Sequence, residues 1–304
     1  MARDDHLWGV DLGGTKIEGV VVSAADPERV IARTRIPTES ALGYAHIVGR
    51  VRLVVEQLEA PSRLRRPAVI GIGTPGAIEP VTGALKNSNT ACLNGKALAR
   101  DLADALGTEA RLANDANCFA LAEATLGAAR GRDIVVGLIL GTGVGGGVVV
   151  HGRVLGGLHG IAGEWGHNPI CGETRPCYCG RVGCVETVIS GPALERFYES
   201  RAGERRALAQ IADRAAHDAA AEATLRRLTD KFGEAIAAVI NILDPDAIVI
   251  GGGVGNIARL YDPLTRAAIQ RRLFNPELRT EILRPTLGDS AGVFGAALLA
   301  RDEG

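Results

Sequence analysis

The segment from Glu164 to Glu186 holds four of the six cysteines of the chain, one of its six histidines and a glutamate at each end. Thiolate and imidazole are the ligands that zinc prefers, and a structural zinc site closes with four of them. One such set consists of His167, Cys177, Cys179 and Cys184, with Cys171 as a competing thiol nearby. Because three cysteines and a histidine leave no open position, we expect a structural zinc ion that fastens this loop and positions its glutamates.

A first glycine turn, Asp11-Leu12-Gly13-Gly14-Thr15-Lys16, has the composition of a phosphate-binding loop. Its glycines let the backbone approach a bulky anion, and successive N–H groups can form a nest for phosphate. Thr15 adds a hydroxyl donor and Lys16 a positive charge. Asp11 stands at the end of a strand, where a carboxylate can hold Mg²⁺ through water. An ordinary tight turn, in which Asp and Gly are common, is the competing interpretation of this motif taken alone.

A second glycine turn runs from Gly141 to Gly147 and includes Thr142 and Gly143. Its letters also match the dinucleotide-binding pattern G-x-G-x-x-G, which requires a helix to begin at the glycines. Here three valines typical of a strand follow, so we expect a second phosphate-binding hairpin instead. After a later strand, Gly252 and Gly253 would allow a base or ribose to lie against the backbone, although a triple glycine is weak evidence by itself.

Asp115 lies just before a helical segment and has two competing interpretations. As a helix N-cap it would only bond a backbone N–H. As a catalytic base it would take a proton from a hydroxyl while that oxygen attacks phosphorus. Beside two candidate phosphate loops we favour the base, and a cap position would also fix the carboxylate. The amides and hydroxyls of residues 86–90 offer the donors and acceptors that a polyol needs, and a solvated loop explains them equally well.

The two glycine turns belong to segments that resemble each other at a separation of 128 residues. Gly9–Val22 and Gly137–Val150 agree at seven of fourteen positions, and each has the strand-turn-strand pattern of a β-hairpin. We interpret them as the openings of two duplicated halves, with chance similarity between Gly/Val-rich strands as the alternative. The clearest helix is predicted over about 224–243, ending before Asp244-Pro245. Shorter helices are predicted at 96–106, at 116–126 and from about 291.

Composition excludes several kinds of partner. The formal net charge of −1 provides no global basic field to attract nucleic acid or an anionic membrane. No apolar run approaches the ~20 residues of a membrane-spanning helix, and the charged N-terminus lacks the apolar core of a signal peptide. The cysteines cluster within a large chain rather than forming the framework of a small secreted one, so we expect a cytoplasmic protein.

Together the motifs resemble the ROK family of sugar kinases and repressors. The resemblance rests on D-L-G-G-T-K at 11–16, N-D-A-N at 114–117, G-T-G-V-G-G at 141–146, E-W-G-H at 164–167 and C-Y-C-G-R-V-G-C-V-E at 177–186. It spans nearly the whole chain and implies an α/β, actin-like ATPase (ribonuclease H-like) fold of two domains with an active-site cleft between them. The implied first domain covers 1–116 with the C-terminal helix 291–304 folded back onto it, and the second covers 117–290 with the zinc loop.

The resemblance also implies roles for matching positions. Asp115 would be the catalytic base. Sugar contacts are implied for Asn89, Asn114, Glu164, His167 and Glu186. Nucleotide and Mg²⁺ contacts are implied for Asp11, Gly13, Gly14, Thr15, Lys16, Gly141, Thr142 and Gly143, with Gly252 and Gly253 on the adenosine side. His167 would serve twice, with one ring nitrogen on zinc and the other near the sugar.

Within the family, the segments 81–95, 111–118, 164–169 and 241–253 are similar to bacterial fructokinases that also accept mannose. One departure is Cys92, which stands where those enzymes tend to have Trp. The smaller side chain would reshape the wall beside the sugar, so the preferred hexose stays open. The segment between His167 and Cys177 is also shorter than in those relatives.

We therefore expect an ATP-dependent hexose kinase that converts fructose to fructose 6-phosphate, with mannose as a further substrate. The alternatives are a glucokinase or N-acetylhexosamine kinase of the same family, or a sugar-binding regulator without catalysis. The expected cofactors are ATP, Mg²⁺ and structural Zn²⁺, and the resemblance suggests a homodimer. The repressor branch carries an N-terminal helix-turn-helix domain, whereas this chain begins at the first strand, so we expect no nucleic-acid partner.

Overall fold

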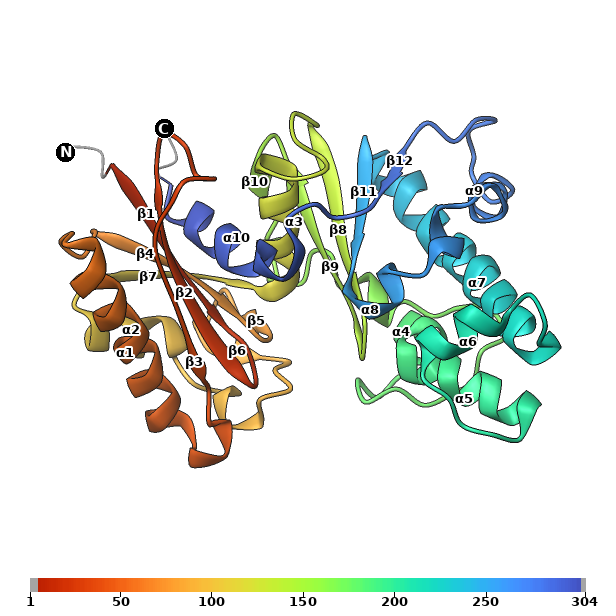
Figure 1. Cartoon of the computed structure of the whole chain (residues 1–304), viewed down its shortest axis with the longest axis horizontal. Helices are drawn as coiled ribbons and strands as arrows, with labels where there is room; N and C mark the ends of the chain where they lie inside the picture. The colour runs from red at the N-terminus through yellow and green to blue at the C-terminus, as the bar shows by residue number, and fades with distance from the viewer. Residues whose placement is uncertain (1–4, 302–304) are drawn as a thin grey trace. The chain divides into compact units, whose positions relative to one another are not determined.

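The computed structural model of the chain describes residues 5–301, which form two compact units (Figure 1). The first unit extends to Arg130 and also contains residues 153–162 and the chain from Leu287 onward. The second contains residues 131–152 and 163–286. Each unit has its own β-sheet and its own hydrophobic core, as expected of separate domains.

The sheet of the first unit has the strand order β3-β2-β1-β4-β7. Its strands are β1 (His6–Leu12), β2 (Lys16–Ser23), β3 (Val30–Pro37), β4 (Val69–Thr74) and β7 (Glu109–Asn114). β1 pairs antiparallel with β2, which confirms the first predicted hairpin. β1, β4 and β7 are parallel, so their carboxyl ends bring Asp11 and Asn114 to the same edge of the sheet.

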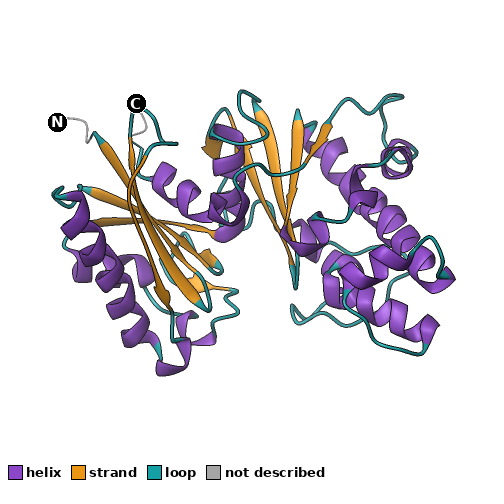
Figure 2. Ribbon diagram, in the orientation of Figure 1, coloured by secondary structure: helices purple, strands orange, loops and turns teal. Residues whose placement is uncertain are grey.

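Helices cover both faces of this sheet (Figure 2). They are α1 (Tyr44–Ser62), α2 (Leu98–Leu106), α3 (Asp115–Thr125) and α10 (Ala291–Leu299). On one face, Trp8, Val10 and Leu12 of β1 pack in a core with α1 and α2. On the other face, α10 packs directly on β1 and β4. A Cβ atom at Gly9 or Gly71 would overlap the backbone of α10, so the two glycines permit this close approach.

Within the second unit, the strand order β9-β8-β11-β12 repeats the order β2-β1-β4-β7 of the first sheet. The strands of the second unit are β8 (Ile134–Leu140), β9 (Val144–Val150), β11 (Ala247–Gly251) and β12 (Glu281–Leu283). β8 pairs antiparallel with β9 and parallel with β11, as β1 does with β2 and β4. The second predicted hairpin is therefore confirmed, and each hairpin provides the antiparallel part of an otherwise parallel sheet.

The helices of the second unit are α4 (Val185–Ile189), α5 (Gly191–Ala202), α6 (Leu208–Arg214), α7 (Ala219–Leu243), α8 (Gly252–Gly255) and α9 (Pro263–Gln270). Helix α7 begins earlier than predicted because the Asp218 carboxylate accepts hydrogen bonds from the N–H groups of Ala220 and Ala221. It ends as predicted, with Asp244 in the left-handed region at φ 44°. Within residues 5–301 no helix has both the length and the apolarity that a bilayer crossing requires.

Three segments, residues 117–130, 153–162 and 287–290, belong to the first unit although the predicted limits of 1–116 and 117–290 place them in the second. Helix α3 packs closely on α10, where Gly295 faces the backbone of Cys118 without an intervening Cβ. Residues 153–162 include the short strand β10 (Arg153–Val154). They approach a small hairpin formed by β5 (Ala77–Ile78) and β6 (Leu85–Lys86), in which Lys86 Nζ donates to the carbonyl of His159 at 2.8 Å.

Two of the four passages of the chain between the units, those at residues 130–131 and 286–287, are fastened to the first unit by one side chain, Glu123 of α3. Its carboxylate is fully buried and accepts hydrogen bonds from Ala128 N–H at 2.8 Å and Leu287 N–H at 3.1 Å. The first donor precedes the passage after Arg130, and the second follows the passage before Leu287. The hydrogen bond from Leu287 thus joins two residues that are 164 positions apart in the sequence.

We expect Glu123→Ala to lower the free energy of unfolding by at least about 2 kcal/mol, because two backbone donors lose their acceptors at about 1–3 kcal/mol each. Glu199→Ala is the matched control, since Glu199 is exposed on helix α5. Urea denaturation of both variants measures the difference. Equal midpoints for the two variants would show that Glu123 does not stabilise these passages.

Candidate functional site

The first glycine turn is fixed from inside by a residue that the sequence analysis did not identify, Thr38. Gly13 N–H donates to the Lys16 carbonyl at 3.0 Å and closes the turn. The fully buried Thr38 donates its hydroxyl to the Gly13 carbonyl at 2.7 Å and its N–H to the Thr15 carbonyl at 2.9 Å. Gly14 and Thr15 are left exposed at the tip. Their N–H groups, rather than that of Gly13, are therefore placed to meet an anion.

Asp11 lies at the end of β1 in a space that two glycines leave open. A Cβ atom at Gly73 would stand 3.3 Å from Asp11 Oδ1, and one at Gly292 would stand 2.8 Å from Asp11 Oδ2. Side chains at these positions would crowd the carboxylate. The absence of both side chains lets the carboxylate fit between β4 and the start of α10.

The charge of Asp11 is disfavoured by its surroundings. Burial raises the pKa of Asp11 to about 6, and the negative charges of Asp115 and Glu18 act in the same direction against the opposing charges of Lys16 and Arg35. A hard divalent cation takes oxygen ligands and would stabilise the ionised form. The donor chemistry at Asp11 therefore fits the Mg²⁺ that the phosphate-loop interpretation requires.

The raised pKa of Asp11 predicts a pH-dependent effect of Asp11→Asn on stability in the absence of divalent cations. A carboxyl with a folded-state pKa of about 6 and an unfolded-state pKa of 3.8 stabilises the fold fully below 3.8, and this contribution is lost as pH rises through about 6. At about pH 8 the wild type therefore carries a buried charge that Asn lacks. We expect Asp11→Asn to raise the thermal unfolding midpoint at about pH 8, and by less at about pH 4. Equal changes at both pH values would contradict this account, and Asp104→Asn on the exposed side of α2 is the control.

Asp115 is the first residue of α3, so the competing interpretation of Asp115 as the N-cap of that helix does not hold. The cap is Asn114, whose Oδ1 accepts the Asn117 N–H at 2.7 Å. Asp115 Oδ1 accepts the N–H of Ala116 at 2.8 Å, which holds the carboxylate in place. Burial raises the pKa of Asp115 and the backbone hydrogen bonds oppose that rise, while part of the residue stays open to solvent. A fixed, accessible carboxylate with a raised pKa suits a general base.

The amide-rich loop after β6 is built around Asn94, whose side chain accepts the Ser88 N–H and donates to the Ser88 carbonyl, both at 2.9 Å. Thr90 N–H donates to Ser88 Oγ at 3.1 Å. A Cβ atom at Gly14 would lie 3.5 Å from Thr90 Oγ1, so this loop reaches the first glycine turn. Asn89 is exposed beside it. The first unit thus gathers Asp11, the first turn, Asn89, Asn114 and Asp115 around one sheet edge.

In the second unit, the second glycine turn contacts Glu186 of α4. Gly141 N–H donates to the Gly143 carbonyl at 2.9 Å, and Val144 N–H donates to Glu186 Oε2 at 3.0 Å. A Cβ atom at Gly143 would stand 2.8 Å from the same carboxylate oxygen. Strand β9 begins at Val144, directly after the turn, so the helix that a dinucleotide-binding motif needs is not formed there.

Glu164 and His167 come from the turn that leads to the zinc segment, the 3₁₀ helix η3 (Trp165–His167). Buried Trp165 donates its Nε1–H to the Gly145 carbonyl at 3.1 Å and packs edge-on against Phe232 of α7. This anchor holds η3 against β9. Glu164, His167 and Glu186 are thereby brought to the second glycine turn within the same unit.

The predicted metal ligands also come together. The ligand atoms of His167, Cys177, Cys179 and Cys184 all lie within 4.8 Å of one another. His167 Nδ1 is 3.6 Å from Cys177 Sγ, and Cys179 Sγ is 3.6 Å from Cys184 Sγ. A tetrahedral zinc site with Zn–S bonds of ~2.3 Å has edges of about 3.8 Å, so this donor set fits zinc. Cys171 is exposed and is not part of the cluster among the described residues.

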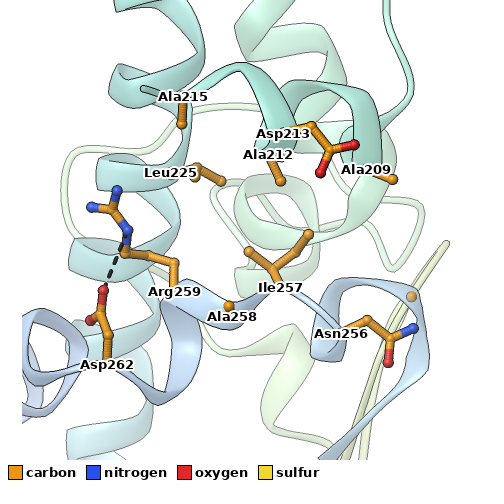
Figure 3. Close-up of a pocket in the computed structure, with 11 residues that line it drawn as sticks. Ala209, Ala212, Asp213, Ala215, Leu225, Asn256, Ile257, Ala258, Arg259 and Asp262 are labelled. Atoms are coloured by element: carbon orange, nitrogen blue, oxygen red, sulfur yellow. Dashed lines mark ion pairs between the residues drawn. The ribbon is translucent and has the colours of Figure 1, made fainter. Parts of the chain in front are cut away.

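A cavity of about 700 Å³ opens beside the triple glycine of the second unit (Figure 3). Small and apolar side chains line it, including Ala209, Ala212 and Ile257, together with polar Asp213 and Asn256. Gly253 lines it as well, whereas Gly252 lies in the left-handed region at φ 82° and turns the chain beneath the carbonyl of Leu140. Apart from the triple glycine, sequence motifs gave no signal for this cavity, because the rest of its lining comes from separate helices without a shared pattern.

Comparison with known proteins gives one consistent result. Residues 7–303 match the ROK family. An N-acetyl-D-glucosamine kinase of Aliivibrio salmonicida (strain LFI1238) is 35% identical over 305 residues, covering 96% of this chain and 98% of the relative. An N-acetylgalactosamine kinase of Shewanella sp. (strain ANA-3) is 34% identical over 302 residues, covering 96% of each. The solved structure of a ROK hexokinase from Thermus thermophilus matches with a TM-score of 0.86 and 34% identity over 97% of both chains.

These matches confirm the predicted α/β, actin-like ATPase fold. They do not support the predicted likeness to fructokinases, because the relatives are named for N-acetylated sugars. Cys92 already marked the point at which the sequence departs from fructokinases. The chain belongs to the ROK family, as a sugar kinase.

Proposed function

We propose that this protein is an ATP-dependent kinase that phosphorylates the primary hydroxyl of an N-acetylhexosamine. The observation that supports this proposal most directly is the position of Asp115. Its carboxylate has a raised pKa and is held at the start of α3 beside Asp11 and the first glycine turn. Phosphoryl transfer needs little from a protein beyond positioning, charge stabilisation and a base for the attacking hydroxyl. The two groups of side chains described above offer each of these.

In the proposed reaction, Asp115 accepts the proton of the sugar hydroxyl as that oxygen attacks the γ-phosphorus of ATP. The exposed N–H groups of Gly14 and Thr15, with Lys16, hold the phosphates from the first unit, and Thr142 and Gly143 hold them from the second. Asp11 would hold Mg²⁺, which neutralises charge on the phosphates when bound. Water must be kept from the phosphorus, since it competes with the sugar as acceptor.

The nucleotide base is assigned to the cavity beside Gly253. Its volume of about 700 Å³ falls in the ~300–1,000 Å³ range of small-molecule sites. Its small side chains leave room for a flat ring, and Asp213 and Asn256 offer acceptors and a donor for ring edges. This agrees with the adenosine-side role that the sequence analysis gave to Gly252 and Gly253.

The sugar is assigned to Asn89, Asn114, Glu164, His167 and Glu186, with zinc holding the loop of the last two. The choice of an N-acetylhexosamine over fructose is supported by the names of the relatives. It also agrees with Cys92, a partly buried residue whose side chain is much smaller than Trp and so leaves space for an acetamido group. The predicted homodimer stays a prediction.

A coupled assay of ADP release tests this proposal across N-acetylglucosamine, N-acetylgalactosamine, N-acetylmannosamine, glucose, mannose and fructose. We expect the highest kcat/KM with one of the N-acetylated sugars. A clear preference for fructose or glucose would contradict the sugar assignment. The absence of ADP release with every sugar, combined with tight sugar binding, would favour the non-catalytic regulator instead.

A further inference from the structure

His167 presents its two ring nitrogens to different partners. Nδ1 faces the cysteine cluster, 3.6 Å from Cys177 Sγ. Nε2 lies 3.1 Å from the phenol oxygen of Tyr178. The two rings meet edge to face, with centroids 5.2 Å apart and planes at 88°. The nitrogen that the proposed function turns toward the sugar is therefore already engaged by a side chain of the same loop.

The direction of this hydrogen bond follows from the metal site. When Nδ1 binds zinc, the proton of the imidazole must reside on Nε2, which then donates to a neighbouring acceptor. Tyr178 provides that acceptor in the form of its phenol oxygen. A sugar hydroxyl that accepts from Nε2–H would have to take the place of this oxygen.

The side chain of Tyr178 can readily turn away from His167. Its residue surface is 76% exposed, so few packing contacts restrain the ring. Its backbone stands between two predicted zinc ligands, Cys177 and Cys179, so the main chain can stay fixed while the side chain turns. The phenol also lies near Glu164 and Glu186, the two carboxylates assigned to the sugar.

We propose that Tyr178 is a specificity-determining residue whose phenol occupies His167 Nε2 in the sugar-free protein and is exchanged for a sugar hydroxyl on binding. This inference rests on the proposed function. It means that the bond to Tyr178 must be broken before the sugar gains its own bond to His167. A sugar with a hydroxyl in the matching position must break the bond between Tyr178 and His167, whereas a sugar without that hydroxyl leaves it intact. Tyr178 therefore lowers the affinity of the matching sugars and limits their advantage over sugars that lack the hydroxyl.

Tyr178→Phe removes the competing oxygen and keeps the ring. We expect the dissociation constant of N-acetylglucosamine, measured by isothermal titration calorimetry without ATP, to fall by about two- to tenfold, the equivalent of one exposed hydrogen bond. The kcat should change by less than about twofold, because no reacting atom is touched. Zinc content, measured by elemental analysis, should equal that of the wild type. Tyr44→Phe, which removes a phenol bonded to Asp101 in the first unit, is the matched control and should leave the dissociation constant unchanged.

Deoxy analogues of the sugar separate exchange from a general loosening of the loop. The analogue that lacks the hydroxyl bound by Nε2 should gain nothing from Tyr178→Phe, while the others gain as the parent does. An equal gain with every analogue, unchanged or weaker binding of the parent sugar, or loss of zinc from the variant would each overturn the inference. A wild type that binds none of the sugars would overturn the proposed function together with this inference, so the two failures are told apart by the wild-type titration.

Discussion

Replacing Asp115 by Asn should reduce kcat with the preferred sugar by about 10²–10⁴-fold, the usual contribution of a general base. Asn has the same shape, and its Oδ1 can keep the hydrogen bond from Ala116 N–H that positions the side chain. Sugar affinity should therefore stay within about threefold of the wild type, since the lost interaction is formed only as the proton moves. The coupled ADP assay and calorimetry of sugar binding measure the two quantities separately.

The raised pKa of Asp115 gives the same experiment a second test. A base acts only when ionised, so wild-type kcat/KM should fall as pH decreases through a value above 3.8, and the residual activity of Asp115→Asn should lack that limb. Asp104→Asn, an exposed substitution on α2, serves as the control and should retain full turnover. Near-normal turnover of Asp115→Asn would refute the assignment of the base.

Removing one ligand of the metal cluster should abolish sugar binding without changing the residues that carry out phosphoryl transfer. Cys184 is fully buried and is the ligand nearest α4, the helix that carries Glu186. Changes outside the ligand set alone weaken metal affinity by about 10–100-fold, so loss of a ligand should exceed that. We expect Cys184→Ala to contain no zinc after dialysis against a chelator and to bind N-acetylglucosamine at least about 100-fold more weakly.

Cys171→Ala is the matched control for this change. Cys171 is a cysteine of the same segment but lies outside the cluster of ligand atoms, so the variant should keep one zinc ion per chain and normal sugar binding. Its backbone is held by Glu234 and Lys231 of α7, which the substitution leaves in place. If Cys184→Ala binds sugar as the wild type does, zinc does not position the sugar-binding loop.

Most of the fold could be predicted from local patterns in the sequence. The hairpins at 9–22 and 137–150 were predicted because strand alternation and glycine turns are short-range signals, and the paired strands bear them out. Helix α7 was predicted from its apolar period, and its end from Asp244-Pro245. Its start was missed because Asp218 caps the helix from a polar stretch that shows no apolar period.

Features that depend on distant residues could not be predicted. Thr38 stabilises the first glycine turn from 25 positions away, and its hydroxyl looks like that of any loop threonine in the sequence. The N-cap alternative for Asp115 overlooked Asn114, because Asp and Asn cap helices equally well and only the start of the helix decides between them. Tyr178 was passed over as a residue between two cysteines, although its place in the metal motif put it beside His167.

The central claim, phosphoryl transfer from ATP to the primary hydroxyl of an N-acetylhexosamine, is tested most directly by phosphorus NMR of the reaction product. Wild-type protein incubated with ATP, Mg²⁺ and N-acetylglucosamine should yield ADP and one sugar phosphate in equal amounts. The product signal should be split by the two protons of a CH₂–O–P group, which identifies the 6-phosphate. A phosphate split by a single anomeric proton, or release of inorganic phosphate without any sugar phosphate, would contradict the account.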